Sequence, residues 1–473
     1  MGEMIRATDA APAPGDRRLL VAIGGALGLS LTVGLLVNWL VGAAVLAVTL
    51  GITARPLDLF RATLALAAVA TFVSNEGGHL TRDLSIVSLV VTYALLCLAV
   101  ARAGGRWTFP RSELTSALLI LALTTTQAVV HGLLAQHSRK FIALELLPML
   151  ALCSAPMVGG MRFDASDLRL ALRVLVVVAL IHVGLGVAAY ARAHARTGGV
   201  AFTGIPGMVA LIVLNVWLYG RHHRARLWAA ALIAALLFHQ IISFTRGYWL
   251  GLLVCVPGSC LLYVGRGQGM RDRAGEVVKL LVPALLLAGV CVLTFGALFG
   301  WTDLWSTLGS RIASSFATQS SRQTVSNIAR LIEYRSSMLS IVNAPWLGHG
   351  LGFTLDVYQP SYGVTAHQSY IHQMYLLVWL KQGIVGLLAL IGALAFGTLL
   401  GVRAAVRLTG DAAGWSAGVA ACTTFLAVHC MTNMTLASVN GNFMIAFLWG
   451  LILSVSEGKS LRLFARRLPV GFS

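Results

Sequence analysis

Charged residues are scarce in this chain. Lys, Arg, Asp and Glu make up 11% of its 473 residues, less than half of the roughly 25% that is typical of soluble domains. So few charges cannot cover a water-facing surface of ordinary extent. Hydrophobic residues make up 58%, and apolar runs of the roughly 17–25 residues that span a bilayer recur along almost the whole length. Because helices satisfy their own backbone hydrogen bonds in hydrocarbon, we expect an all-α, polytopic membrane helix bundle.

Signatures of several other classes are missing as well. The seven cysteines form no CxxC or other metal-ligand spacing, so we expect them to be small buried apolar residues. There is no DxD pair and no ATP-binding signature, and the short alternating segments of an outer-membrane barrel are absent. No small-residue cleavage site follows the first apolar run, so no removable signal peptide is expected. We expect neither a metal nor a cofactor.

Hydropathy predicts twelve to fourteen transmembrane helices, the lower number applying if one pair is merged or re-entrant. The predicted spans are Leu19–Leu36, Trp39–Ala54, Leu59–Ser74, Leu84–Ala101, Leu114–His131, Phe141–Val158, Ala171–Tyr190, Val200–Gly220, Leu227–Phe244, Gly247–Val264, Lys279–Leu298, Tyr375–Leu400, Trp415–Met434 and Asn442–Val455.

The distribution of basic residues predicts the orientation of these spans. With the N-terminus inside, more than twice as many Lys and Arg residues lie inside as outside, which obeys the positive-inside rule. Both termini are then cytoplasmic, and the net charge of +18 needs no nucleic-acid partner. The predicted organisation is a cytoplasmic tail (1–18), an N-terminal transmembrane bundle (19–299), an outer loop subdomain (300–373), C-terminal transmembrane helices (374–457) and a basic cytoplasmic tail (458–473).

The segment between 300 and 373 is the one long interval outside the predicted membrane. Apolar residues recur at helical spacing in Arg311–Phe316 and in Asn327–Val342, and the sequence NAP at Asn343–Pro345 ends the second run. A turn-rich stretch with three glycines follows. We therefore expect a small, mostly helical subdomain that caps the membrane part.

Arginines at the outer edge of the membrane run against the charge bias. Arg246 stands between two spans that leave almost no loop, so it must lie at the outer boundary. Other outer arginines are Arg192, Arg196, Arg322, Arg330 and Arg335. One interpretation is that they reach toward lipid headgroups. The other is a guanidinium cluster that binds a phosphate or diphosphate through bidentate hydrogen bonds.

Three histidines, His349, His367 and His372, lie in the same loop. Histidine is the usual proton acceptor near neutral pH, although a lone loop histidine is more often an ordinary surface residue. A spacing of five between His367 and His372 does not suit a helical zinc site. No acidic residue stands next to them in the sequence. His372 is therefore a candidate base, and a metal site is not expected.

Several of these segments together resemble the O-antigen ligase and polymerase superfamily. The matching pieces are RLIEY at Arg330–Tyr334, PWLGHGLGF at Pro345–Phe353, HQMYL at His372–Leu376 and GIVG at Gly383–Gly386, with SFTRGYW at Ser243–Trp249 and RTGGVAFTGIP at Arg196–Pro206. The resemblance covers roughly 190–390. Gln373 replaces the asparagine of the family pattern, and Lys381 stands where an acidic residue is common.

The resemblance implies an enzyme of the bacterial inner membrane with a periplasmic active site. It implies transfer of O-antigen glycan from undecaprenyl diphosphate to a lipid A core sugar, without a metal and with inversion. His372 would be the base, and Arg246 with Arg330 or Arg322, and Arg196, would bind the diphosphate. Tyr375, His367, Arg335 and Gln373 would position the acceptor or the loop.

Two alternatives stay open. An O-antigen polymerase would join repeat units while both substrates remain on the carrier lipid, and the sequence separates it poorly from a ligase. The alternative from a different class of protein is a lipid-linked glycan flippase or other transporter. Transporters tend to have paired halves and charged or broken helices at mid-membrane, whereas the charges here gather at one face.

Overall fold

The computed structural model describes residues 109–456, except 161–162, 164, 194–203, 221–225, 244, 267–268, 303–305, 307–308, 310–320, 361–362, 434–435 and 437–438. All of these residues belong to the second of two units, Phe109–Ser473. The first four predicted spans and both predicted tails lie outside the described residues.

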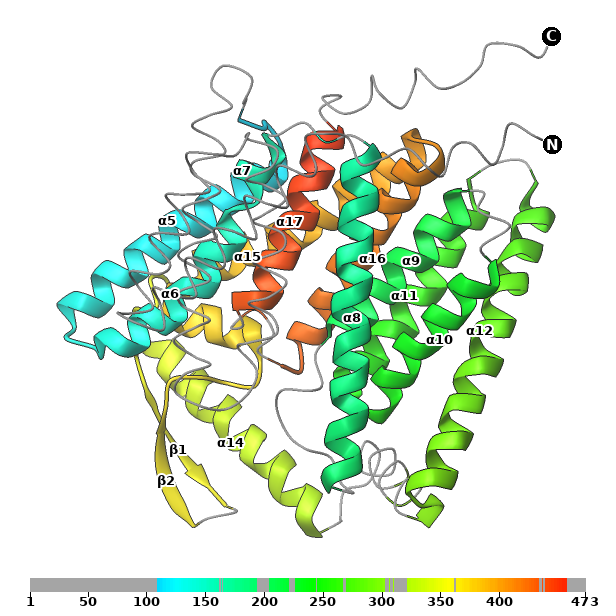
Figure 1. Ribbon diagram of the computed structural model, residues 1–473. Coiled ribbons are helices and arrows are strands. Elements are labelled where there is room, and N and C mark those ends of the chain that lie inside the picture. Colours follow the sequence, from blue (N-terminus) through cyan, green and yellow to red (C-terminus); the bar gives the residue numbers. More distant parts are fainter. Residues whose placement is uncertain are drawn as a thin grey trace, which may run out of the picture. The chain divides into compact units, whose positions relative to one another are not determined.

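The described part is almost entirely helical, and each of the ten spans predicted within it is found (Figure 1). The helices that match them are α5 (Glu113–Leu134), α6 (Arg139–Cys153) with α7 (Ala155–Gly159), α8 (Ala165–Ala193), α9 (Ile205–Gly220), α10 (Arg226–Ile242), α11 (Arg246–Val264), α12 (Met270–Phe299), α15 (Met374–Arg407), α16 (Gly410–Cys430) and α17 (Val439–Ser456). Within the described residues, seven spans are long and apolar enough to cross a membrane, and three are shorter. The prediction of an all-α polytopic membrane protein is confirmed.

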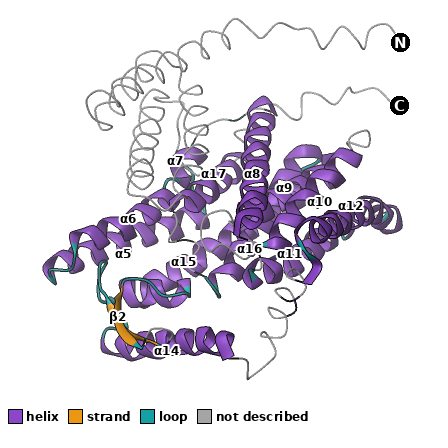
Figure 2. Ribbon diagram, turned by 60° about the horizontal axis from the view of Figure 1, so that its bottom comes forward, coloured by secondary structure: helices purple, strands orange, loops and turns teal. Residues whose placement is uncertain are grey.

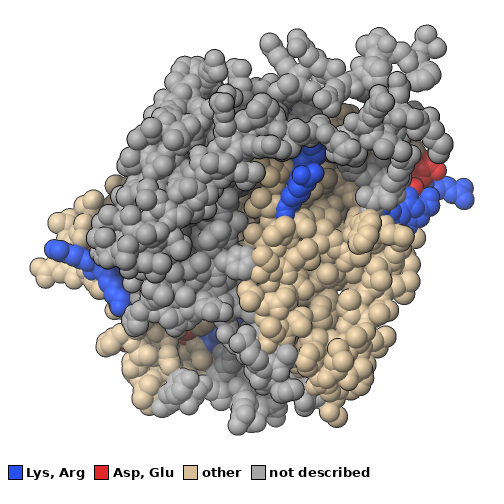
Figure 3. Space-filling model, viewed as in Figure 1, with Lys and Arg blue, Asp and Glu red and all other residues tan. Residues whose placement is uncertain are grey.

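The outer helices of the bundle expose large apolar side chains. On α12, for example, Leu286 is 67% and Leu293 is 56% exposed, and on α11 Leu253 is 72% exposed. The face drawn in Figure 3 carries few charged side chains among the described residues. Helix α16, by contrast, is buried along most of its length. A buried central helix surrounded by lipid-facing ones is what a membrane bundle requires, because lipid replaces water around the outer side chains.

The loop between α12 and α15 contains α14 (Ser321–Asn343) and an antiparallel hairpin of β1 (Leu355–Gln359) and β2 (Val364–Gln368). Both ribbon views place them together at one end of the bundle, beside α15 (Figures 1 and 2). Helix α14 confirms the helix expected at Asn327–Val342. The hairpin was not predicted, so the loop is less helical than expected.

Helix α15 is broken at Gly383, where the backbone has φ 72° and ψ −174°. The break leaves carbonyls without helical partners, and the glycine-rich turn of the loop supplies donors. The backbone N–H of His349 donates to the Leu380 carbonyl (2.8 Å), and that of Gly350 donates to the Lys381 carbonyl (3.0 Å). Beyond the break, the Ile384 N–H donates to the Pro345 carbonyl (2.9 Å). The turn therefore completes the hydrogen bonding of a broken helix, as buried backbone groups require.

The same turn is attached to two further membrane helices. Leu351 donates its N–H to the Ala128 carbonyl of α5 (2.9 Å), and Gly352 donates to the Glu145 carboxylate of α6 (2.7 Å). Four successive N–H groups thus join the loop to α15, α5 and α6. The segment of α15 just before its break is therefore connected to α5 and α6 through the turn.

A buried ion pair lies under the turn. The Lys381 ammonium, whose side chain is 3% exposed, donates to Glu145 (2.7 Å) and to the carbonyl of Phe353. Lys381 is thus buried against α6, where it neutralises the carboxylate that also receives the N–H of Gly352.

Candidate functional site

His372 lies just before α15 and contacts the carboxylate of Glu333 on α14. Its ring Nδ1 is 2.9 Å and 3.0 Å from the two carboxylate oxygens, and its backbone N–H donates to the same carboxylate (3.3 Å). The Glu333 side chain is 6% exposed, whereas that of His372 is 36% exposed. A buried carboxylate therefore fixes both the backbone and the ring of a partly accessible histidine.

The contact determines what the imidazole can do. An ionised carboxylate only accepts hydrogen bonds, so Nδ1 must carry the proton in this pair. In the neutral ring Nε2 is then the proton acceptor. A histidine held in this way by a carboxylate is the arrangement expected for a general base. Sequence reasoning missed Glu333 as a partner, because it lies 39 residues from His372.

The sequence did hold one signal for this pairing, which is that the loop contains few acidic residues. The two acids of the loop that the structure describes, Glu333 and Asp356, each contact a histidine. Neither is paired with a loop arginine in the described contacts. Had each acid been assigned a histidine rather than an arginine, the pairing could have been anticipated.

The helical repeat determines on which side of α14 the two candidate arginines lie. Arg330 lies one turn before Glu333, on the same side of the helix, and both act on the Tyr334 phenol. Burial raises the pKa of Tyr334, and the Arg330 guanidinium opposes that rise. Arg335 is exposed and lies on the opposite side of α14 from Glu333, two residues away. The structure therefore brings Arg330, and not Arg335, to the Glu333 face.

Arg246 is the first residue of α11 and is half-buried. The next residue packs tightly on the end of α16: a Cβ on Gly247 would lie 2.6 Å from the His429 ring. The ring of Tyr248 stacks on His429 with centroids 4.4 Å apart. The start of α15 borders the same end of α16, because the Tyr375 hydroxyl donates to the Ala427 carbonyl (2.8 Å). The start of α11, with Arg246, and the start of α15, just after His372, thus both border the end of one buried helix.

The remaining predicted residues are placed as follows. Gln373 caps α15, its side chain accepting the N–H of Leu376 (2.9 Å). His367 lies on β2, exposed, and forms an ion pair with Asp356 of β1. Arg322 lies in the first turn of α14, but its side chain is outside the described part, as is the whole of Arg196. Neither arginine's role is tested.

Within the described residues, no three His, Cys, Asp or Glu side chains converge closely enough to hold an ion. His372 has one carboxylate partner, and His367 has another. The donor sets found are therefore histidine–carboxylate pairs.

Fold and site together define a multi-pass membrane protein in which a histidine–carboxylate pair and arginines gather at one end of the bundle. Residues 240–391 match the family model described as O-antigen ligase. This segment contains Arg246, Arg330, Glu333 and His372, and it confirms the resemblance to the O-antigen ligase superfamily. No curated protein matches the chain. The match implies a membrane enzyme of glycosyl transfer, of the O-antigen ligase or polymerase type.

Proposed function

We propose that the protein is an O-antigen ligase that transfers glycan from undecaprenyl diphosphate to a sugar of the lipid A core, at the periplasmic face of the bacterial inner membrane. The observation that carries the proposal is the contact between His372 and the buried Glu333 within the family segment. It supplies an oriented proton acceptor where a hydroxyl must be activated.

The reaction follows from these groups. The acceptor hydroxyl gives its proton to Nε2 of His372 while its oxygen attacks the anomeric carbon. The bond from that carbon to the diphosphate oxygen breaks, and the lipid diphosphate leaves. A positioned base typically contributes roughly 10²–10⁴-fold to the rate. Direct attack inverts the anomeric centre.

Negative charge grows on the leaving diphosphate and needs preorganised cations. Arg246 and Arg330 are the described arginines that we assign to it, and Arg322 and Arg196 are further candidates. Guanidinium groups suit this role because their fork of donors matches phosphate oxygens. With arginines in place, we expect transfer without a metal.

A product analysis tests the assignment. Purified protein is given carrier-linked glycan and lipid A core together, with a chelator present. Glycosylated lipid A core is the expected product. Lengthening of the carrier-linked glycan would instead indicate a polymerase. Neither product, together with movement of carrier-linked glycan across vesicles, would indicate a transporter.

A further inference from the structure

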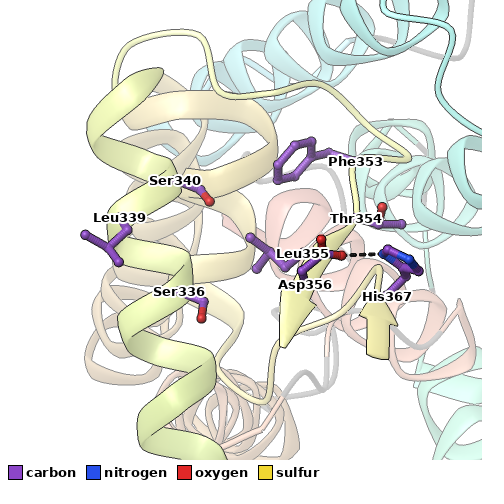
Figure 4. A pocket seen from close by; sticks show the side chains of 8 residues that line it. All are labelled: Ser336, Leu339, Ser340, Phe353, Thr354, Leu355, Asp356 and His367. Carbon is purple, nitrogen blue, oxygen red and sulfur yellow. Dashed lines mark ion pairs between the residues drawn. The ribbon is translucent and has the colours of Figure 1, made fainter. Parts of the chain in front are cut away.

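An open pocket lies between α14 and the β1–β2 hairpin. It has a volume of about 550 Å³ and is lined by Ser336, Leu339, Ser340, Phe353, Thr354, Leu355, Asp356 and His367. Ligand pockets typically measure roughly 300–1,000 Å³. Figure 4 shows Ser336 and Ser340 projecting from α14 toward the hairpin, where Asp356 and His367 are joined. The pocket is therefore large enough for a ligand and has polar groups on both of its walls.

The lining residues suit a saccharide. Ser336, Ser340 and Thr354 offer hydroxyls, and Asp356 with His367 offers an acceptor and a donor for sugar hydroxyls. Phe353 adds an aromatic surface for the apolar C–H face of a sugar ring. That ring stacks on His349, with centroids 4.3 Å apart at 17°. Among the described residues that line the pocket there is no Lys or Arg, so these walls do not suit a diphosphate.

The position of the pocket relates it to the reacting groups. Glu333, Ser336 and Ser340 follow one another at i, i+3 and i+7, and so share one side of α14. At 1.5 Å per residue, the two serines lie about 4.5 Å and about 10.5 Å along the helix axis from Glu333. A chain of sugars whose reacting unit is at His372 would therefore reach this pocket with its next units.

We infer that the pocket between α14 and the hairpin is a saccharide subsite, which holds the sugar units next to the one that reacts at His372. The inference rests on the proposed function for the identity of the reacting unit. The saccharide comes either from the carrier-linked glycan or from the lipid A core. The subsite would then determine how strongly the enzyme depends on units beyond the reacting one.

Binding tests the subsite without catalysis. The probes are the lipid-free oligosaccharides that mild acid releases from the carrier-linked glycan and from lipid A core. Each is titrated into the full-length purified protein. One probe should bind the wild type, and Asp356→Asn and His367→Gln should each weaken that binding about tenfold, as expected for loss of a hydrogen bond to a charged group. The probe that binds identifies the source.

The matched control is Thr365→Ala. Thr365 lies on β2, two residues from His367, and is exposed without lining the pocket. Its variant should bind the probe like the wild type. Binding of neither probe to the wild type, or equal binding by the wild type and both pocket variants, would overturn the subsite.

Kinetics separate this inference from the proposed function. Asp356→Asn should raise KM for the substrate with the long saccharide about tenfold and leave KM for a substrate truncated to its reacting sugar unchanged. Transfer with unchanged KM in the pocket variants would overturn the subsite and leave the ligase intact. If the wild-type protein binds the probe but transfers no glycan, the ligase proposal is overturned and the subsite stands.

Discussion

Glu333 and His372 are separated by 39 residues, yet the carboxylate of one lies 2.9 Å from the ring Nδ1 of the other. The pair joins α14, in the loop, to the start of α15, in the bundle. The orientation of His372, which we propose as the base, therefore depends on how the loop is held against the membrane helices.

Replacing Glu333 tests whether the carboxylate positions the base. Glu333→Gln keeps the size of the side chain but removes the charge that fixes Nδ1–H. We expect kcat to fall about 10²-fold or more, as for loss of a general base, with KM changed much less. Glu333→Asp should restore part of the rate.

The control for this substitution is Glu113→Gln. Glu113 is an exposed carboxylate on α5 that lies 3.7 Å from the guanidinium of Arg403. Its variant should transfer at the wild-type rate. A Glu333→Gln enzyme with normal kcat would show that His372 needs no carboxylate.

Arginine substitutions test recognition of the diphosphate. Arg246→Ala and Arg330→Ala should each raise KM for the carrier-linked glycan about 10–100-fold, because a hydrogen bond to a charged group contributes about 1.5–3 kcal/mol. Arg246→Lys keeps the charge and should lose much less. Equal losses in Arg246→Ala and Arg246→Lys would mean that positive charge alone does not explain the residue.

Two glycines, one in the glycine-rich turn and one between β1 and β2, give a matched pair of substitutions. Gly350 has φ 85°, and a Cβ there would lie 2.6 Å from the backbone N of Gly132 on α5. Gly363 has φ 65° with nothing within 4 Å of such a Cβ. Both alanine variants carry the left-handed strain of about 1–2 kcal/mol, but only Gly350→Ala also forces the turn away from α5.

Thermal unfolding of the purified proteins measures the difference. Gly350→Ala should have a clearly lower Tm than Gly363→Ala, and it should lose activity as well. Similar Tm values for the two variants would contradict the close approach of the turn to α5.

The buried ion pair is tested by a double-mutant cycle. Lys381→Met leaves the Glu145 carboxylate buried without its cation, and breaking such a pair typically costs about 3–5 kcal/mol. Adding Glu145→Leu removes that charge and should recover part of the stability. The recovery should be incomplete, because Gly352 then loses the acceptor of its N–H. Additive losses of Tm in the double variant would contradict the coupling.

Hydropathy predicted the described helices well because lipid selects for apolar length, and this signal is local in the sequence. Arg246 was placed at a helix end for the same reason, and it is the first residue of α11. The hairpin was missed because β1 and β2 have five residues each, too few for a clear alternation. The pairs Glu333–His372 and Lys381–Glu145 were missed because tertiary folding, and not local pattern, brings their members together.

The most direct test is an in vitro transfer assay with carrier-linked glycan, lipid A core and chelator. It compares the wild type with His372→Ala and with the control Glu113→Gln, all shown to be folded by their Tm. We predict glycosylated lipid A core from the wild type and the control, and a loss of about 10²–10⁴-fold in His372→Ala. Normal transfer by His372→Ala would contradict the assignment of His372 as the base.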